Sequence, residues 1–161
     1  MNFNNFFDLF HITPCVFVDI KKLDYTYQNL QQLFHPDQQK NEIDNQAAIV
    51  LSSKIAKAYD TLKNPLLCVD HLLYLKNCCT LHQHENSIFD SDILEENMDF
   101  QEKFLSPEYD APTLMEHIEQ KIKITVKKLE EAYQKDDIDT LEKQALYFFY
   151  RYQFWLKLKK I

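Results

Sequence analysis

The chain has 161 residues and contains no glycine, and this absence restricts the folds it can adopt. Glycine supplies most of the positive-φ backbone positions that tight β-hairpins and many helix ends require. A chain without glycine has few ways to build a sheet from tight turns, and Asn and Asp must form its left-handed helix caps. Because 45% of the residues are hydrophobic, the chain can still bury the core of one domain or of two small ones. We therefore predict an all-α fold.

Two apolar patterns with helical spacing lie on either side of the tripeptide His35-Pro36-Asp37. Pro36 has no amide donor and its ring pushes His35 out of the helical region, so the first helix must end before it. Asp19 can cap the start of that helix, and Pro65 follows the end of the second. The sequence therefore predicts a helical hairpin with the tripeptide at its tip. The two patterns comprise Ile20, Leu23, Tyr27, Leu30 and Phe34, and then Ala48, Leu51, Ile55, Ala58, Tyr59 and Leu62.

Three more helical patterns follow in the second half of the chain. Thr113 is predicted to cap the second of them, with Glu116 completing a capping box. Asp136 or Asp137 is predicted to cap the third. Three helices with short connections favour an antiparallel three-helix bundle. The patterns span residues 90 to 105, 113 to 134 and 136 to 161.

The segment between the two halves is polar and has no helical periodicity, which predicts a linker over residues 76–89. It separates a predicted N-terminal domain, residues 1–75, from a predicted C-terminal bundle, residues 90–161.

The first helix of the bundle carries two apolar groups on different sides. Ile93, Asn97, Phe100 and Phe104 share one narrow sector and are predicted to face the core. A second group, which we call the outer strip, consists of Leu94, Met98 and Leu105, about a quarter turn away at 100° per residue. The outer strip is bordered by acidic residues. Periodicity alone leaves two interpretations open, a binding strip or a widening of the core stripe.

The hairpin resembles a J-domain, the module with which J-proteins stimulate ATP hydrolysis by heat-shock chaperones of the DnaK class. The stretch Ile55–Leu75 is similar to the third-helix region of one J-protein branch, HscB. The segment Ile93–Phe104 resembles the HscB segment that receives the iron–sulfur scaffold protein of the IscU type. The resemblance implies a co-chaperone of iron–sulfur cluster assembly that is not an enzyme. Its partners would be an HscA-type chaperone and an IscU-type scaffold, and an adaptor for a different client is the alternative.

The resemblance also implies which residues bind each partner. J-domains usually carry several basic residues on the helix before the tripeptide, but few are present here, so three lysines must attract the chaperone. In the bundle, Glu95 stands where an apolar residue is common. The last helix is short, and its best match for an aromatic contact is Phe148, with Phe149 as the alternative. The other implied contacts are His35, Pro36, Asp37, Lys21, Lys22 and Lys40 for the chaperone, and Leu94, Met98, Asp99 and Glu102 for the scaffold.

Composition argues against several other classes of protein. A net charge of −7 with a single Arg disfavours a nucleic-acid surface, because binding to phosphates requires clustered Lys and Arg. No apolar run approaches membrane-spanning length, and the first residues lack the basic region and apolar core of a signal peptide. We expect a monomer in a bacterial-type cytoplasm, with a mature form in the mitochondrial matrix as the alternative.

Three alternative interpretations concern the tripeptide and the cluster of Cys and His residues that follows later in the chain. His35 and Asp37 could act as a general base pair, but no nucleophile in a recognisable setting accompanies them, and a chain without glycine has no P-loop. The tripeptide could also be an ordinary loop. Cys78, Cys79, His82 and His84 could bind zinc, but no Cys-x-x-Cys pair is present. We expect no metal and no cofactor, and we expect reduced thiols at Cys15, Cys68, Cys78 and Cys79.

Overall fold

The computed structural model describes residues 5–34, 42–79, 81, 91–106, 108 and 110–160. Every regular element within these ranges is a helix, as the all-α prediction requires. The chain divides into two compact units, Met1–His71 and Leu72–Ile161, and the boundary falls inside one helix.

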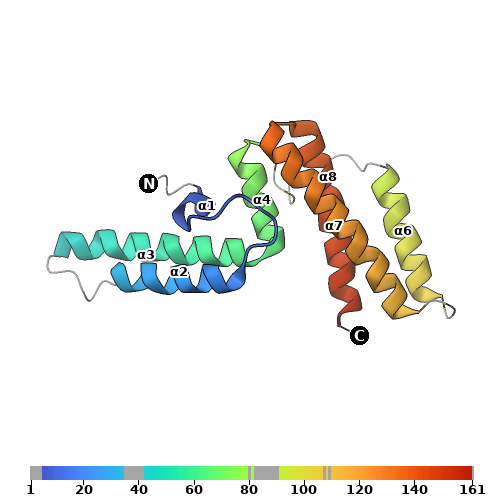
Figure 1. Ribbon diagram of the computed structural model, residues 1–161, viewed down its shortest axis with the longest axis horizontal. Helices are drawn as coiled ribbons and strands as arrows, with labels where there is room; N and C mark the ends of the chain where they lie inside the picture. The colour runs from blue at the N-terminus through green and yellow to red at the C-terminus, as the bar shows by residue number, and fades with distance from the viewer. Residues whose placement is uncertain are drawn as a thin grey trace. The chain divides into compact units, whose positions relative to one another are not determined.

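The first unit is built on a helical hairpin. Helix α1 (Phe6–Leu9) packs on α3 (Glu42–Lys63), and α2 (Ile20–Leu33) runs antiparallel beside α3 (Figure 1). Helix α4 (Pro65–Leu75) starts directly after Asn64 and crosses into the second unit. The predicted hairpin is therefore confirmed.

Five of the eleven residues in the two predicted apolar stripes are buried, and five more are partly buried. Asp19 caps α2 as predicted, since its Oδ1 accepts hydrogen bonds from the amides of Lys21 and Lys22 at 3.0 and 3.3 Å. Ile20 differs from the prediction, because it is the first residue of α2 and stays 41% exposed. The buried hydrophobic residues of this unit are Phe7, Leu9, Phe10, Val16, Leu23, Ala48, Ile55, Ala58, Leu62, Cys68 and Val69.

Tyr59 joins α2 and α3 through both its ring and its hydroxyl. The ring stacks on Tyr27 with 4.2 Å between centroids, and the hydroxyl donates to Asp24 Oδ1 at 2.7 Å. The same hydroxyl accepts a hydrogen bond from Lys63 Nζ at 2.7 Å. A position that the sequence marks only as apolar thus also fixes the pairing of the two helices through polar contacts.

His71 connects α4 to α1. Its Nε2 accepts a hydrogen bond from the backbone amide of Phe6 at 3.0 Å, and its ring stacks on the Phe6 ring at 4.2 Å. The side chain is buried, and this burial lowers the pKa of His71 to about 4. An imidazole that accepts a hydrogen bond at Nε2 must be unprotonated there, so the neutral form holds α1 in place.

The second unit contains three long helices, α6 (Ser91–Leu105), α7 (Ala111–Lys135) and α8 (Ile138–Leu158). Helices α7 and α8 pack against each other along their length, and α6 lies along them (Figure 1). Their interior contains mainly aliphatic and aromatic side chains. The buried residues of these helices are Ile93 and Phe100; Leu114, Ile118, Ile122, Thr125, Leu129 and Ala132; and Leu141, Ala145, Phe148, Phe154 and Leu158.

The helix ends correct one prediction and confirm another. Asp110, not Thr113, caps α7: its Oδ2 accepts hydrogen bonds from the Thr113 amide at 3.3 Å and hydroxyl at 3.0 Å. Pro112 at the start of α7 fits this earlier cap, because the first turn needs no amide donor there. Asp136 ends α7 in the left-handed region with φ of 55°, and Asp137 caps α8.

Three described residues have positive φ: His11, Asn77 and Asp136. Asn77 and Asp136 agree with the expectation that Asn and Asp replace glycine at such positions. His11 was not expected, although His also occurs in the left-handed region more often than most residues.

The predicted domain borders, residues 1–75, 76–89 and 90–161, remain predictions, because residues 80 and 82–90 lie outside the described part. Among the described helices, none is both long and apolar enough to cross a membrane.

The His71 contact predicts a pH dependence of folding stability. Because the folded-state pKa of about 4 lies below the usual 6.5, the stabilisation is complete above pH 6.5 and is lost as the pH falls towards 4. The loss should be on the order of 3 kcal/mol in the free energy of unfolding. Urea unfolding of the wild type and of His71→Gln between pH 7 and 4 measures it.

Gln can still accept a hydrogen bond from the Phe6 amide but does not titrate in this range. The variant should therefore be less pH-dependent than the wild type, whatever its stability at pH 7. Equal slopes in the two proteins would show that other groups cause the acid sensitivity.

Candidate partner-binding surfaces

The tripeptide and its surroundings are described in part. His35, Pro36, Asp37 and Lys40 lie outside the described residues. Lys21 and Lys22 are exposed in the first turn of α2, at the opposite end of that helix from the tripeptide. The charges of Lys21 and Lys22 are thus accessible to a partner, and their role in attracting the chaperone remains a prediction.

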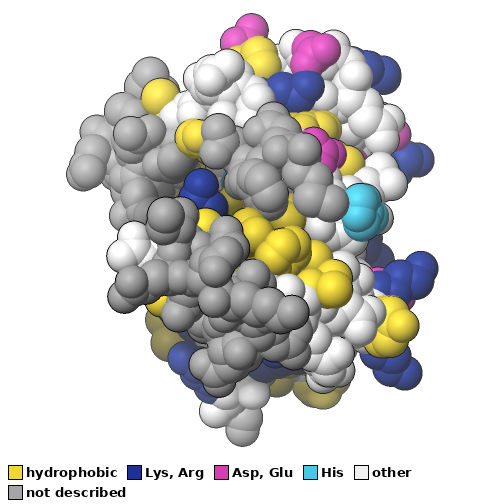
Figure 2. Space-filling model, turned by 90° about the vertical axis from the view of Figure 1, so that its left-hand side faces the viewer, with side chains coloured by type: hydrophobic (Ala, Val, Ile, Leu, Met, Phe, Trp, Pro, Cys, Tyr) yellow, Lys and Arg dark blue, Asp and Glu magenta, His cyan; other side chains and the backbone are white. Residues whose placement is uncertain are grey.

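The end of the hairpin exposes apolar side chains. Leu33, in the last turn of α2, is 65% exposed, and Ile49 and Val50 of α3 are 53% and 58% exposed. The space-filling view of this side shows hydrophobic side chains at the surface beside residues that are not described (Figure 2).

The outer strip of α6 faces solvent. Met98 is 70% exposed, Leu105 is 78% exposed and Leu94 is half-buried. No other large hydrophobic side chain in the described part of the chain is more exposed than Met98 and Leu105. The interpretation that these residues widen the core stripe is therefore wrong for Met98 and Leu105.

Acidic side chains border this strip, as predicted. Glu95, Asp99 and Glu102 are all exposed. Asp99 Oδ2 forms an ion pair with Lys103 Nζ at 2.7 Å, one turn further along α6. This pair reduces the net charge at one end of the acidic border, so Glu95 and Glu102 contribute most of the negative potential.

The predicted core sector of α6, about a quarter turn from the outer strip, packs against α8 through aromatic rings. Phe100 is buried and stacks on Phe154 at 5.5 Å between centroids, and Ile93 is buried about two turns earlier. Phe104 meets Phe154 edge-on at 6.0 Å but remains 41% exposed, because it lies in the last turn of α6. The predicted core sector is thus confirmed for Ile93 and Phe100 and only partly for Phe104.

Phe148 does not lie at a surface. It is fully buried within the second unit and stacks on Tyr152 at 5.2 Å. A side chain without accessible area cannot contact a partner, so the prediction of a scaffold contact at Phe148 does not agree with the structure. Phe149, the predicted alternative, is partly exposed.

Glu96 forms a polar network that the pattern of apolar positions did not reveal. Its carboxylate accepts hydrogen bonds from Lys121 Nζ of α7 and, at 2.7 Å, from Arg151 Nη2 of α8. Burial raises the pKa of Glu96, but the hydrogen bonds from Arg151 and Lys121 outweigh this effect and bring the pKa below its usual value. Glu96 is therefore ionised at neutral pH.

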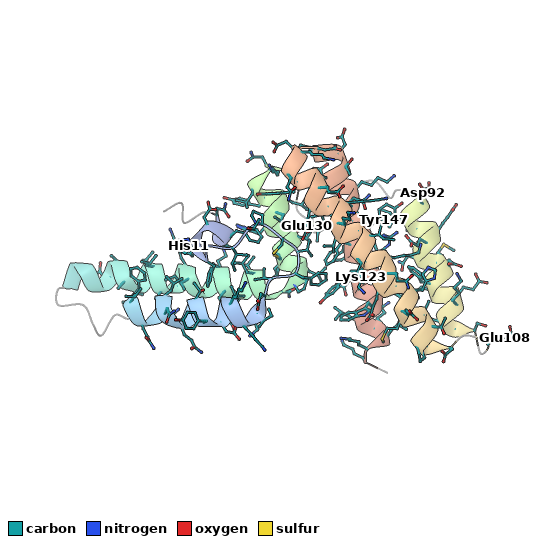
Figure 3. The ribbon with its side chains drawn as sticks, in the orientation of Figure 1. His11, Asp92, Glu108, Lys123, Glu130 and Tyr147 are labelled. Atoms are coloured by element: carbon teal, nitrogen blue, oxygen red, sulfur yellow. The ribbon has the colours of Figure 1, made fainter. Side chains whose placement is uncertain are left out.

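Arg151, the partner of Glu96 on α8, also forms hydrogen bonds to α7. Arg151 Nη1 donates to Thr125 Oγ1 and, at 3.4 Å, to the Lys121 carbonyl oxygen, and Thr125 Oγ1 donates to that same carbonyl at 2.7 Å. The Arg151 guanidinium also lies 4.6 Å from the ring of Tyr147, which is labelled in Figure 3 with the side chains around it. These contacts join all three helices of the bundle through one polar network. A signal for it existed in the sequence, because Arg151 is the only arginine of the chain.

A small cavity lies between α6 and α8. Its enclosed volume is about 10 Å³, about the space of one water molecule. The α6–α8 groove is therefore too small for a typical small-molecule ligand. The lining residues are Ile93, Glu96, Asn97, Phe100, Tyr147, Tyr150 and Arg151.

The structure describes the cysteines of the alternative zinc site but not its histidines. All four are free thiols, and the pKa of Cys78 is raised, mainly by burial. His82 and His84 lie outside the described residues. Within the described part of the chain, no group of three or more His, Cys, Asp or Glu side chains could hold a metal ion.

Comparison with known proteins adds the family. No protein-family model matches this chain. A co-chaperone HscB homologue from Pseudoalteromonas atlantica is 30% identical over 129 residues, which cover 78% of this chain and 73% of that protein.

Two solved structures have the same fold. Chaperone HscB from Vibrio cholerae matches with a TM-score of 0.73 and 21% identity, covering 97% of this chain and 96% of that one. Human co-chaperone HscB matches with a TM-score of 0.77 and 24% identity, covering 96% of this chain and 80% of that one. The fold is thus a J-domain hairpin followed by a helical bundle. From this fold and its sequence relatives, the chain belongs to the HscB family of co-chaperones.

Proposed function

We propose that this protein is a co-chaperone of iron–sulfur cluster assembly that binds two partners through two separate surfaces. The hairpin with His35, Pro36 and Asp37 stimulates ATP hydrolysis by a DnaK/HscA-class chaperone. The α6 surface binds an IscU-type scaffold protein and delivers it to that chaperone. The protein acts as a monomer in the cytoplasm and catalyses no reaction itself.

The observation that carries the proposal is the exposed outer strip of α6. Met98 and Leu105 expose most of their apolar surface to water, whereas Ile93 and Phe100 of the same helix are buried. Burying that surface against a partner would be favourable by roughly 25 cal/mol for each Å². An apolar centre with an acidic border fits a partner that presents an apolar patch surrounded by basic side chains.

The chaperone surface is supported by the arrangement of the hairpin. Helices α2 and α3 are antiparallel, and the tripeptide joins their ends. Only Lys21 and Lys22 provide exposed basic charge on α2, so electrostatic steering of the chaperone should be weak. We therefore expect the affinity for the chaperone to depend only modestly on salt.

His35→Gln or Asp37→Asn should abolish stimulation of the chaperone ATPase while the protein remains folded. Substitutions in a polar connecting segment usually change the free energy of unfolding by no more than about 0.5 kcal/mol. The measurement is the steady-state ATPase rate of a DnaK/HscA-class chaperone with each variant, and circular dichroism checks the folding.

His11→Asn is the matched control for His35→Gln. It changes an exposed histidine of the same unit to a residue that tolerates the positive φ at this position. It should stimulate as the wild type does. Stimulation that survives in both tripeptide variants would contradict the J-domain assignment.

The double variant Leu94→Ala, Met98→Ala should weaken scaffold binding by on the order of 2 kcal/mol or more, because a few central apolar residues provide most of the binding energy of an interface. Charge reversal at Asp99 and Glu102 should mainly slow association and flatten its salt dependence. Calorimetry gives the affinity for an IscU-type scaffold, and stopped-flow mixing gives the rate.

Ile124→Ala is the control for the apolar truncation, because Ile124 of α7 is 56% exposed and lies outside the outer strip. It should bind the scaffold normally. If the folded double variant binds as tightly as the wild type, the scaffold surface lies elsewhere, and if the wild type does not bind any IscU-type scaffold, the client is a different protein.

A further inference from the structure

Helix α6 has apolar side chains on two sides, and only one side packs against α7 and α8. Ile93 and Phe100 are buried, whereas the outer strip, at least at Met98 and Leu105, is exposed. Rotation of α6 by about a quarter turn would bring the outer strip to the interior and move Ile93 and Phe100 towards solvent. Burial of apolar area by itself distinguishes poorly between these two rotations, because both bury side chains of similar size.

Glu96 distinguishes between them through charge. Its carboxylate is bonded to Lys121 and Arg151, and the side chains of Glu96 and Arg151 are only 15% and 14% exposed. If α6 rotated, the carboxylate would leave both cations. Arg151 would then remain largely buried without its counter-charge, which is costly in a protein interior.

The position of Glu96 in the sequence connects this network to the outer strip. Leu94 lies two residues before Glu96 and Met98 two residues after it. Two residues of an α-helix correspond to about 200°, so both side chains lie nearly opposite Glu96. Holding Glu96 inward therefore holds Leu94 and Met98 outward.

We propose that Glu96 is a positioning residue: its ion pairs with Arg151 and Lys121 fix the rotation of α6 that presents Leu94 and Met98 to the scaffold. This role rests on the proposed function, because it concerns the same surface. Buried ion pairs often contribute little to stability compared with apolar residues of similar volume, but they can specify one arrangement among several. Glu96 would act in this second way.

The test uses the full chain with Glu96→Ala and Arg151→Ala together, which removes both buried charges of the closest pair and leaves no large side chain at either position to favour one rotation. Lys121 is 35% exposed and can turn its ammonium group to water. The variant should be folded, since removal of both partners leaves neither charge buried alone. A role of Glu96 in stability alone predicts a lower free energy of unfolding while Met98 keeps the accessibility that it has in the wild type.

The first readout is the rotation of α6 itself. Hydrogen peroxide oxidises exposed methionines, and mass spectrometry follows Met98 with Met115 of α7 as an internal reference. In the wild type Met98 should be oxidised quickly, because it is 70% exposed. In the double variant its oxidation should be at least about threefold slower, because the rotated form dominates.

The second readout is the affinity for an IscU-type scaffold, measured by calorimetry. If only about a tenth of the molecules present the outer strip, the affinity should fall about tenfold. The single variant Glu96→Gln, which keeps the shape of the side chain, should give a smaller change of the same sign in both readouts. If the double variant does not fold, the two readouts of Glu96→Gln test the proposal instead. Glu131→Gln, an exposed carboxylate on α7, is the control for loss of one negative charge and should behave as the wild type.

Oxidation of Met98 at the wild-type rate in folded variants would overturn the proposal. Faster oxidation would also overturn it, because α6 would then detach from the bundle instead of rotating. If the wild type does not bind the scaffold at all, the proposed function fails, but the oxidation rates still decide whether Glu96 sets the rotation of α6.

Discussion

The ion pairs of Glu96 with Arg151 and Lys121 join α6 to both other helices of the bundle, and the proposed scaffold-binding strip depends on them. Helix α6 buries only Ile93 and Phe100 fully, and its remaining apolar side chains are half-buried or exposed. A helix held by so few apolar contacts needs a second means to define its orientation. A charged group joined to both neighbouring helices supplies one, and it leaves the apolar outer strip available to a partner.

The hairpin of the first unit is specified by a different combination of contacts. Its core is apolar and continuous, and the pairing of α2 with α3 is fixed by Tyr59, which bonds to Asp24 and stacks on Tyr27. His71 adds a contact between α4 and α1 that requires a neutral imidazole. These contacts hold α2 and α3 together and attach α1 to α4.

Much of this fold could be predicted from the sequence because helical periodicity and helix caps are local signals. The stripe from Ala48 to Leu62 and the cap at Asp19 are examples. Predictions failed where the result depends on tertiary packing or on two competing local choices. Phe148 was predicted as a contact from the resemblance alone, whereas its full burial is set by tertiary packing. Asp110 and Thr113 are both good capping residues, and Pro112 fits the earlier start of α7. Glu96 was missed because its partners lie 25 and 55 residues away.

We propose that one chain binds the chaperone and the scaffold at the same time. The most direct measurement is the ATPase rate of the chaperone at a fixed low concentration of this protein while scaffold is added. Linking the two partners raises their effective concentration, so the rate should increase well beyond the sum of the separate effects of the two proteins. A mixture of the two separate halves of the chain should not reproduce this increase. A rate that equals the sum of the separate effects would contradict the account.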